Sequence, residues 1–404
     1  MSSKPHNSEP GPSTIDMLAL RAYRLGRVQA EMNAAGVGAA LMFNPLNIRY
    51  ATDARNMMLW KTHSWGRYAF LPADSGAILF DAPGSLHQNE ALETVSESRP
   101  STGLGYIYGG EGLVERTAKW AAEIADLVAQ HCGQEKRLAI DRIDPLGANA
   151  LARHGIELVD VSRIMERARL IKSYEEIACM KVAVAACEAG MWAMHQALIP
   201  GITENELWSL LHQANIARDG EWIETRCLAS GERTNPWLQE CSGRAIHAGE
   251  LVAFDTDLIG PFGYMADISR TYYCGIGKPT DEQRRLYSLS YEQIQHDVAL
   301  LAPGMGFAEF AERAWPIPDE FVANRYGCVA HGVGMCDEYP TIGYPTGPGL
   351  GNVDGIFEPG MTICVESYVG ADAGGEGVKL EQQLLVTERG TELLSTFPFE
   401  EELL

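Results

Sequence analysis

The sequence predicts an α/β (α+β) protein with two domains, and three observations lead to this fold class. The chain has 404 residues, which is enough to bury two separate hydrophobic cores. Helical and strand-like segments alternate in its first part, as they do in α/β domains. Beyond about residue 220, glycine-rich turns separate strand-like runs, which indicates a domain rich in β-hairpins.

The first domain is predicted from residue 17 to residue 165. Leu18, Leu25, Val28 and Met32 recur at the spacing of one helical face, and Gly36 is a suitable end for that helix. The alternating elements that follow are strands at 39–44 and 76–81, a helix at about 112–131 and a strand at 137–141.

The second domain is predicted over residues 166–404. A charged connection leads into a long helix at roughly 174–198, which Pro200 and Gly201 end. Thr203 is a candidate cap for the next helix, because acidic residues follow it in the first turn. Two further helices are expected at about 281–301 and 307–314.

The composition restricts the partners and the location of the protein. Hydrophobic residues make up 46% of the chain and charged residues 21%, which is typical of a globular protein. A formal net charge of -22 argues against nucleic acids and anionic membranes as partners. No continuous apolar run approaches the roughly 18 residues of a membrane-spanning helix, so we expect no membrane partner.

The start of the chain and its cysteines both favour the cytoplasm. Residues 1–16 are polar, rich in Ser and Pro and without the apolar segment of a secretory signal, so we predict a disordered leader. The nine cysteines form no CxxC pair, and an odd number favours free thiols in a reducing compartment.

Three aspartates are predicted to meet in one hairpin. LVAFDTD (251–257) alternates as a strand, which puts Asp255 and Asp257 on the same face. GPFG (260–263) is a turn, and YMADISRTYY returns as a second strand that places Asp267 nearly opposite Asp257. Like charges across a strand pair repel each other, and a bound cation is the simplest compensation.

A second hairpin repeats this pattern near the C-terminus. Two apolar runs flank a glycine-rich loop at 370–377, and folding about that loop pairs Glu366 with Glu381. A buried carboxylate is costly when it has no partner, and two that face each other are worse. Together with His331, which lies between the hairpins in sequence, these carboxylates predict a metal site with hard ligands.

The order Asp, Asp, His, Glu, Glu resembles the pita-bread metallopeptidases, a family that includes methionine aminopeptidase, aminopeptidase P, prolidase and the non-peptidase creatinase. MADISRT (265–271) is similar to its second-aspartate strand, AHGVGM (330–335) to its histidine strand and FEPGMTICVE (357–366) to its first-glutamate strand. IKSYEEIACMKVA (171–183) resembles the start of its catalytic domain.

This resemblance covers the chain from about residue 165 onward. It implies a pita-bread catalytic domain with a pseudo-symmetric antiparallel sheet, preceded by a creatinase-like N-terminal α/β domain. It also implies two metal ions, with Asp267 and Glu381 bridging them and Asp255 as an additional candidate ligand. The main implied ligands are Asp257, Asp267, His331, Glu366 and Glu381.

The sequence departs from the peptidases at two histidines that support amide hydrolysis. The segment HGVGMCDE is one residue shorter than the family pattern and carries Asp337 where a second histidine normally stands. In SGERTNPWLQE, Trp237 follows Pro236 where the family has a Pro-His pair. The spacing from Asp257 to Asp267 is also one residue shorter than usual, so amide hydrolysis becomes doubtful.

An aspartate in place of a histidine suits a different reaction. An ionised carboxylate only accepts protons, so Asp337 is a candidate base for removing a proton next to a metal-bound carboxylate. Departure of a leaving group from the neighbouring carbon would complete a β-elimination. A tryptophan at residue 237 suits a cationic substrate, because sulfonium and quaternary ammonium groups favour aromatic faces.

Within the family, this departure resembles the DddP-type dimethylsulfoniopropionate lyases of marine bacteria, in the segments FDTDLIGPFGYMADISRT and HGVGMCDEYP. The resemblance implies a carbon–sulfur lyase that converts dimethylsulfoniopropionate, a small zwitterion, to dimethyl sulfide and acrylate, with Asp337 as the base. It also implies iron, whereas the ligand types alone suit manganese or zinc as well.

Aromatic residues are the candidate substrate contacts. Tyr326 lies five positions before His331 and either lines the pocket or packs in the core. Trp60 and Trp65 belong to the first domain, which in creatinase-like homodimers reaches the partner's active site, so they are candidates to enclose the sulfonium together with Trp237. The alternative for both is the aromatic core of their own domain.

Two other functions remain open alongside the lyase. One is a Xaa-Pro dipeptidase or aminopeptidase-type metallohydrolase, which would need another group in place of the missing histidines. The other is a non-catalytic pita-bread binding protein. Members of that kind usually lose metal ligands, whereas all five are present in this chain.

Overall fold

The computed structural model describes residues 15–275, 277–346 and 354–404. It contains two compact units, one from Asp16 to Arg169 and one from Leu170 to Leu404, and each is described by itself. Most of the predicted leader lies outside the described residues. The predicted domain boundaries at residues 16 and 165 stay predictions.

The N-terminal unit consists of short strands interspersed with helices. Its elements are α1 (Met17–Ala34), β1 (Ala39–Met42), α2 (Pro45–Thr52), α3 (Met58–His63), β2 (Tyr68–Pro72), β3 (Ala77–Asp81), β4 (Val95–Pro100), α4 (Tyr106–Gly109), α5 (Leu113–Cys132), β5 (Arg137–Ile140), α6 (Pro145–Ala152), β6 (Glu157–Asp160) and α7 (Ser162–Leu170). The alternation predicted from the sequence is confirmed for this part of the chain.

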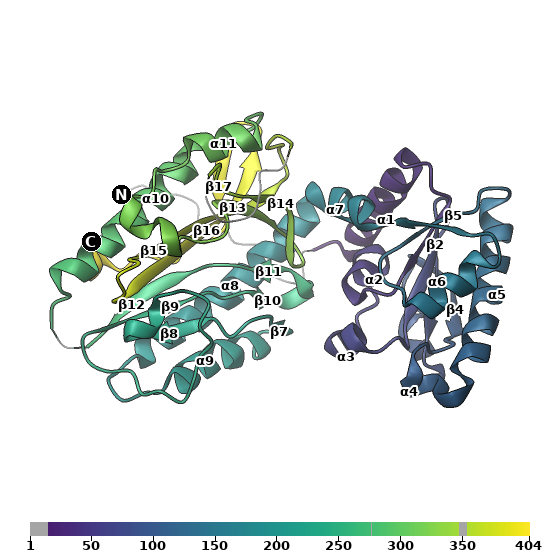
Figure 1. The fold of residues 1–404 in the computed structure, drawn as a ribbon, viewed down its shortest axis with the longest axis horizontal. Helices are drawn as coiled ribbons and strands as arrows, with labels where there is room; N and C mark the ends of the chain where they lie inside the picture. Colours follow the sequence, from purple (N-terminus) through teal and green to yellow (C-terminus); the bar gives the residue numbers. More distant parts are fainter. Residues whose placement is uncertain (1–14, 276, 347–353) are drawn as a thin grey trace, which may run out of the picture. The chain divides into compact units, whose positions relative to one another are not determined.

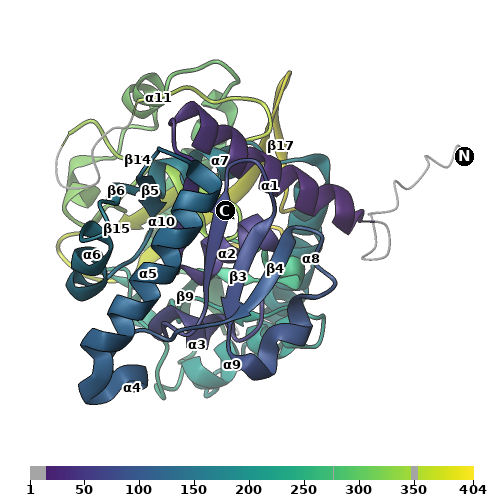
Figure 2. The ribbon, with the colours of Figure 1, turned by 90° about the vertical axis from the view of Figure 1, so that its right-hand side faces the viewer.

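These strands form a mixed six-stranded sheet in the order β4–β3–β2–β1–β5–β6. Every residue of β1, β2 and β3 is buried, which explains their continuous apolar composition. Helix α5 adds Trp120, Ile124 and Leu127 to the core of the sheet. In Figure 2 this helix lies in front of the strands of the unit.

The C-terminal unit combines long helices with eight antiparallel strand pairings among the described residues, four of two or three residue pairs and four of four or more. Its elements are α8 (Tyr174–Ala197), α9 (Glu204–Ile216), β7 (Trp222–Ile223), β8 (Leu228–Ser230), β9 (Glu250–Phe254), β10 (Leu258–Ile259), β11 (Met265–Ala266), β12 (Arg270–Cys274), α10 (Asp281–Leu300), α11 (Phe307–Arg313), β13 (Ala330–Val333), β14 (Asp337–Ile342), β15 (Thr362–Gly370), β16 (Gly377–Thr387) and β17 (Gly390–Leu393).

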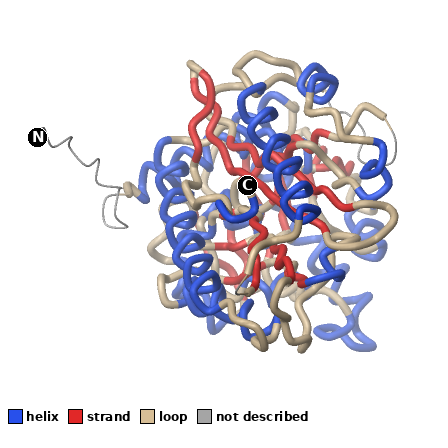
Figure 3. The backbone as a smooth tube through the Cα atoms, turned by 90° about the vertical axis from the view of Figure 1, so that its left-hand side faces the viewer, coloured by secondary structure: helices blue, strands red, loops and turns tan. Residues whose placement is uncertain are grey.

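Helices flank two groups of strands in this unit. Helix α8 packs against β10 and β11, and helix α9 packs against β7 and β8. Helix α10 packs against β15 and β16. Strands β9 and β12 contact β16, so the two groups of strands meet. In Figure 1 these strands lie between α8 and α10, and Figure 3 shows strands through the middle of the unit with helices around them.

Helix starts in this unit follow local sequence signals. Ser173 caps α8 and Thr203 caps α9, each in a capping box with the glutamate three residues later. The predicted cap at Thr203 is therefore confirmed. Helix α8 is also long and apolar enough to cross a membrane, which the search for continuous apolar runs did not predict. However, 61% of its apolar window is buried inside the fold, as is typical of a core helix.

The first predicted hairpin keeps one register but opens in its middle. Arg270 pairs with Phe254 and Ala266 pairs with Leu258, and both pairs belong to the same alignment of the two chains. The residues between them, 255–257 and 267–269, leave the ladder. Thr256 replaces part of it, because its hydroxyl donates to the Ala266 carbonyl and accepts from the Ile268 N–H, both at 2.9 Å.

The prediction of a continuous strand through residues 251–257 is wrong. Strand β9 ends at Phe254, and Asp257 has a φ of 36°, which lies in the left-handed region. Strand alternation therefore does not fix where the Asp255 and Asp257 side chains point. The second hairpin agrees with the sequence, since Glu366 pairs with Glu381 and the turn runs between Gly370 and Gly377.

Candidate metal centre

Three adjacent strands present successive rows of side chains on one face. His331 of β13 pairs with Cys364 of β15, which pairs in turn with Gln383 of β16. Glu366 and Glu381 form the next row. Paired residues of antiparallel strands project from the same face, and residues two apart on a strand do so as well. The sheet therefore brings one histidine and two glutamates together.

The opened middle of the first hairpin supplies the aspartates. Among the residues that the structure describes, potential donor atoms fall into three groups whose members lie within 4.8 Å of one another. The groups are Asp267, His331, Cys364 and Glu381; Asp255, Glu366 and Glu381; and Asp255, Asp257 and Asp267. All six ligands predicted from the sequence thus occur in these groups, although their role as ligands stays a prediction. Cys364 is an addition that the sequence did not suggest.

The polar side chains of this cluster lie close to one another, and little water reaches them. His331 Nε2 lies 3.2 Å from a Glu366 oxygen and 3.6 Å from Glu381 Oε1. The Asp257 N–H points to an Asp267 oxygen at 3.4 Å, and the Thr225 hydroxyl donates to Asp257 at 2.5 Å. His331 is only 6% exposed, so water compensates little of this charge.

Burial and repulsion shift the pKa values of these carboxyl groups. Burial and then Asp255 raise the pKa of Asp257 to about 8. Burial and then Glu381 raise the pKa of Glu366 to about 7, and the same two causes raise the pKa of Asp267 well above its usual range. The cluster therefore holds more negative charge than its surroundings stabilise, which is the condition that favours a bound cation.

Lys379 is the functional candidate that sequence reasoning missed. Its ammonium group is fully buried and lies 2.6 Å from Glu366, 3.1 Å from Asp255 and 3.6 Å from Glu381. It also stands 4.7 Å from the centre of the Tyr326 ring. Strand alternation could have revealed it, because a lysine two residues before Glu381 shares its face.

A network of neutral side chains joins the two hairpins around this lysine. Ser269 donates to Asp255 at 2.8 Å or to Glu381 at 2.9 Å, and it accepts from Lys379 at 2.6 Å. Gln383 accepts from the Asp267 backbone N–H at 3.0 Å. Burial opposes ionisation of Glu381, but Lys379 and then His331 hold its pKa below the usual value.

The residues of the cluster fit a bound metal. Glu381 Oε1 is buried and has no hydrogen-bond partner among the described residues, although it faces His331 and Asp267. A buried carboxylate oxygen without a donor is costly, and a cation would satisfy it. Carboxylate oxygens with one imidazole nitrogen suit first-row divalent metals.

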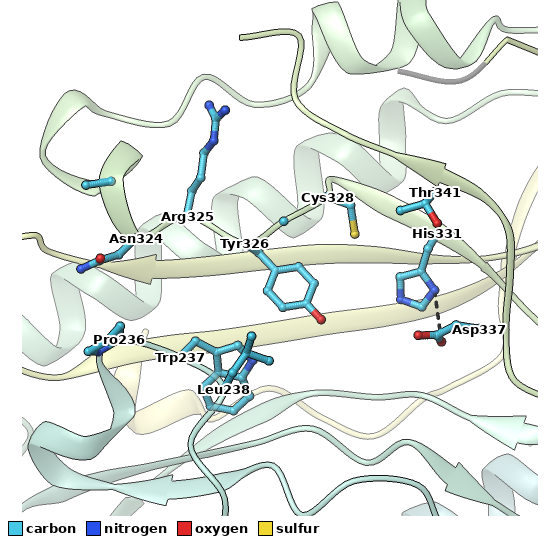
Figure 4. A pocket seen from close by; sticks show the side chains of 12 residues that line it. Pro236, Trp237, Leu238, Asn324, Arg325, Tyr326, Cys328, His331, Asp337 and Thr341 are labelled. Atoms are coloured by element: carbon cyan, nitrogen blue, oxygen red, sulfur yellow. Dashed lines mark ion pairs between the residues drawn. The ribbon is translucent and has the colours of Figure 1, made fainter. Parts of the chain in front are cut away.

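A cavity of about 470 Å³ adjoins this cluster (Figure 4). Asp337 lies on it with a side chain that is 63% exposed, and its Oδ1 is 3.5 Å from His331 Nδ1. Asp337 therefore differs from the buried carboxylates, because it reaches both the cavity and a predicted metal ligand. The lining residues are Pro236, Trp237, Leu238, Ala323, Asn324, Arg325, Tyr326, Gly327, Cys328, His331, Asp337 and Thr341.

Two of the predicted aromatic contacts line this cavity. Trp237 is 8% exposed and packs at 6.0 Å from the Tyr368 ring, and its Nε1 has no hydrogen-bond partner among the described residues. Figure 4 shows the Tyr326 ring between the side chains of Trp237 and His331. Burial and then Glu366 raise the pKa of Tyr326 far above its usual range, so its hydroxyl stays protonated.

The other two predicted aromatics belong to the N-terminal unit. Trp65 packs against the core of that unit, with its ring 5.4 Å from Phe43. Trp60 is 42% exposed and lies edge-on to His63. The core alternative is thus supported for Trp65, whereas contact of either residue with substrate stays a prediction.

Known proteins resemble this chain over both units. The model of the creatinase/prolidase N-terminal domain matches residues 24–171, and that of metallopeptidase family M24 matches residues 178–388. The dimethylsulfoniopropionate lyase DddP of Roseovarius nubinhibens is 40% identical over 399 residues, which is 98% of this chain and 90% of the relative. DddP of Roseobacter denitrificans is 38% identical over 394 residues, which is 96% of this chain and 88% of the relative.

Solved structures share the fold at lower identity. The Xaa-Pro dipeptidase from Bacillus anthracis has a TM-score of 0.76 and 21% identity over 94% of this chain and 99% of its own. The prolidase from Pyrococcus furiosus has a TM-score of 0.72 and 20% identity over 92% of this chain and 100% of its own. The predicted fold class and the predicted resemblance are both confirmed.

Proposed function

We propose that this chain, which belongs to metallopeptidase family M24, is a metal-dependent carbon–sulfur lyase that cleaves dimethylsulfoniopropionate to dimethyl sulfide and acrylate. The observation that carries the proposal is Asp337, a carboxylate on the cavity wall at 3.5 Å from His331. Two relatives at 40% and 38% identity are named for this reaction, which supports the same choice of substrate.

The metal centre in this proposal holds two ions, for which we infer iron, with manganese and zinc as alternatives. When bound, the ions act as Lewis acids that hold the substrate carboxylate and stabilise negative charge beside it. The ligands are those predicted from the sequence, namely Asp255, Asp257, Asp267, His331, Glu366 and Glu381. Lys379 and Ser269 hold three of these carboxylates in place.

Asp337 is the base of the proposed reaction. Its carboxylate takes the proton from the α-carbon, and the electron pair of that bond forms the carbon–carbon double bond. The bond between the β-carbon and sulfur breaks, so dimethyl sulfide leaves as a neutral molecule and acrylate keeps its carboxylate charge. Asp337 suits this role because it is the carboxylate among the residues that line the cavity, and its side chain is 63% exposed.

The sulfonium end of the substrate is assigned to the aromatic side of the cavity. A sulfonium cation is attracted to aromatic faces, and Trp237 and Tyr326 both line the cavity. Lys379 already stands over one face of the Tyr326 ring, which favours Trp237 as the main contact. Trp60 and Trp65 remain candidates in a homodimer, and the cytoplasm remains the expected compartment.

The test compares Asp337→Asn with the wild type for release of dimethyl sulfide. We expect the rate to fall by roughly 100- to 10,000-fold, because an amide cannot remove the proton. The metal content of Asp337→Asn should equal that of the wild type. A lower rate at equal metal content then reflects loss of the base and not loss of the bound metal. Asp319→Asn, a change at an exposed aspartate that does not line the cavity, should keep full activity.

The same assay distinguishes the alternatives. Wild-type protein that holds metal but releases proline from a Xaa-Pro dipeptide, and no sulfide, would show a metallohydrolase instead. Metal-loaded protein that turns over neither compound would favour a binding protein. Sulfide release that persists in Asp337→Asn would remove this residue from the mechanism while leaving the lyase assignment standing.

A further inference from the structure

Leu238 occupies an unusual place at the edge of the cavity. Its backbone has a φ of 72°, in the left-handed region that residues with a Cβ rarely adopt. Its side chain lines the cavity and yet is 68% exposed. The fold gains little from this leucine, because its side chain is largely left in water and its backbone conformation is unfavourable.

The neighbouring residues hold Leu238 in this position. Asn235 donates to the Ala371 carbonyl at 2.8 Å and accepts from Asn324 at 3.1 Å and from the Tyr368 hydroxyl at 3.1 Å. Trp237 is buried against Tyr368. The chain on this side of Leu238 is therefore fixed to strand β15 and to the loop after it.

Unfavourable backbone conformations that persist in a fixed setting concentrate at functional sites. The residues that line the cavity next to Leu238 indicate which function this conformation serves. Leu238 follows Trp237, whose aromatic face suits a cation, and Figure 4 shows the two side chains together on one side of the cavity. An apolar group beside an aromatic face is complementary to a cation that carries methyl groups.

We propose that Leu238 is a specificity-determining residue that forms the outer apolar wall for the methyl groups of an onium substrate. Its side chain becomes buried when the substrate is bound, and it limits the size of the alkyl groups that the cavity accepts. This inference rests on the proposed function, since it assigns the onium end of the same substrate to this side of the cavity.

The first experiment measures binding without turnover. The probe is 3-(trimethylammonio)propionate, in which the amine is a poor leaving group, and its affinity is measured by calorimetry. We expect Leu238→Gly and Leu238→Asn to bind it about tenfold more weakly, as suits the loss of an apolar contact of this size. Both glycine and asparagine tolerate a positive φ, so neither variant should melt at a lower temperature than the wild type.

The second experiment measures selectivity. The ratio of kcat/KM for the diethyl analogue to that for dimethylsulfoniopropionate should rise in Leu238→Gly, because the wall is removed. Leu393→Ala, a matched change at a leucine that is 46% exposed on β17 and does not line the cavity, should bind and discriminate as the wild type does.

The outcomes separate this inference from the proposed function. Unchanged affinity and unchanged selectivity in both Leu238 variants would overturn the inference, even if the wild type releases sulfide. A wild type that binds the ammonium probe through Leu238 but releases no sulfide would overturn the lyase and leave the inference in place. A lower melting temperature in Leu238→Gly would show that the residue serves the fold instead.

Discussion

At the scale of single residues, the position of Lys379 explains how so many buried carboxylates coexist. Its ammonium group contacts Glu366, Asp255 and Glu381, and burial alone would make an ammonium in this place unfavourable. The carboxylates overcome this cost and raise the pKa of Lys379 well above its usual range. The lysine is thus a permanent internal counter-ion of the centre.

Replacing this counter-ion should damage the fold. We expect Lys379→Met to lower the free energy of unfolding by about 3–5 kcal/mol, because it leaves buried carboxylates without their partner. Chemical unfolding of metal-depleted protein measures the effect. The control is Lys181→Met, which removes an exposed pair with Glu392 at 2.8 Å and should cost less than about 1 kcal/mol. Equal effects of the two changes would contradict the role of Lys379.

The sequence revealed some residues of the centre more readily than others. Glu366 and Glu381 stand out because a carboxylate in an otherwise apolar strand must have a partner. Lys379 was missed because one lysine in such a strand carries no signal until its face is compared with that of Glu381. Leu238 could not be predicted, because a positive φ and exposure at a cavity are properties of the folded chain.

At the scale of elements, the opened hairpin shows how polar side chains can replace backbone pairing. The strand pairs β9–β12 and β10–β11 keep one register, and Thr256 bridges the gap between them. Strand alternation predicts the register but not the opening, because the opening depends on side-chain hydrogen bonds. This is why the pairing of Asp257 with Asp267 was predictable and the continuous strand was not.

The start of β9 provides a pH-dependent prediction. Burial opposes ionisation of Glu250, but hydrogen bonds from Arg244 and from the His247 backbone lower its pKa from 4.5 to about 2. A carboxyl with a lowered pKa stabilises the folded state above its ordinary pKa, and this contribution disappears as the pH falls through the folded value. Glu250 should therefore stabilise the protein at neutral pH and not near pH 2.

The measurement compares chemical unfolding of Glu250→Gln and the wild type at successively lower pH. At neutral pH the variant should be less stable by about 1–3 kcal/mol, as expected for hydrogen bonds to a charged group. The difference should shrink below pH 4.5. Glu240→Gln serves as the control, because its pair with Arg226 is exposed and 4.0 Å long. A difference that stays constant with pH would contradict the argument.

At the scale of the whole molecule, the centre depends on the meeting of two groups of strands. One group contributes the aspartates, and the other contributes His331 with both glutamates. The order of these candidate ligands along the chain, together with the segments around them, was enough to predict the fold of the C-terminal unit. Contact of Trp60 or Trp65 with substrate stays a prediction, because these residues belong to the N-terminal unit and not to the unit that holds the candidate centre.

Removing the metal should therefore destabilise the molecule. We expect a chelator to lower the melting temperature, since a ligand at about 100 times its Kd contributes about 2.7 kcal/mol to stability. Restoring iron, manganese or zinc should raise the melting temperature again, most for the native metal. Asp267→Asn should respond little to the chelator, because it has lost a central ligand. A metal-containing wild type with an unchanged melting temperature after chelation would contradict this expectation.

The bond between Ser269 and Glu381 joins residues that are 112 positions apart. A ribosome therefore releases all three aspartates long before it makes the strand that carries Lys379 and Glu381. Contacts of such long range form late, because the chain between them must first be closed into a loop. The two groups of candidate ligands that include Glu381 can be complete only after that strand has docked, whereas the group of Asp255, Asp257 and Asp267 lies within the first hairpin. We therefore expect a newly made chain to hold its full set of candidate ligands only when folding is nearly complete.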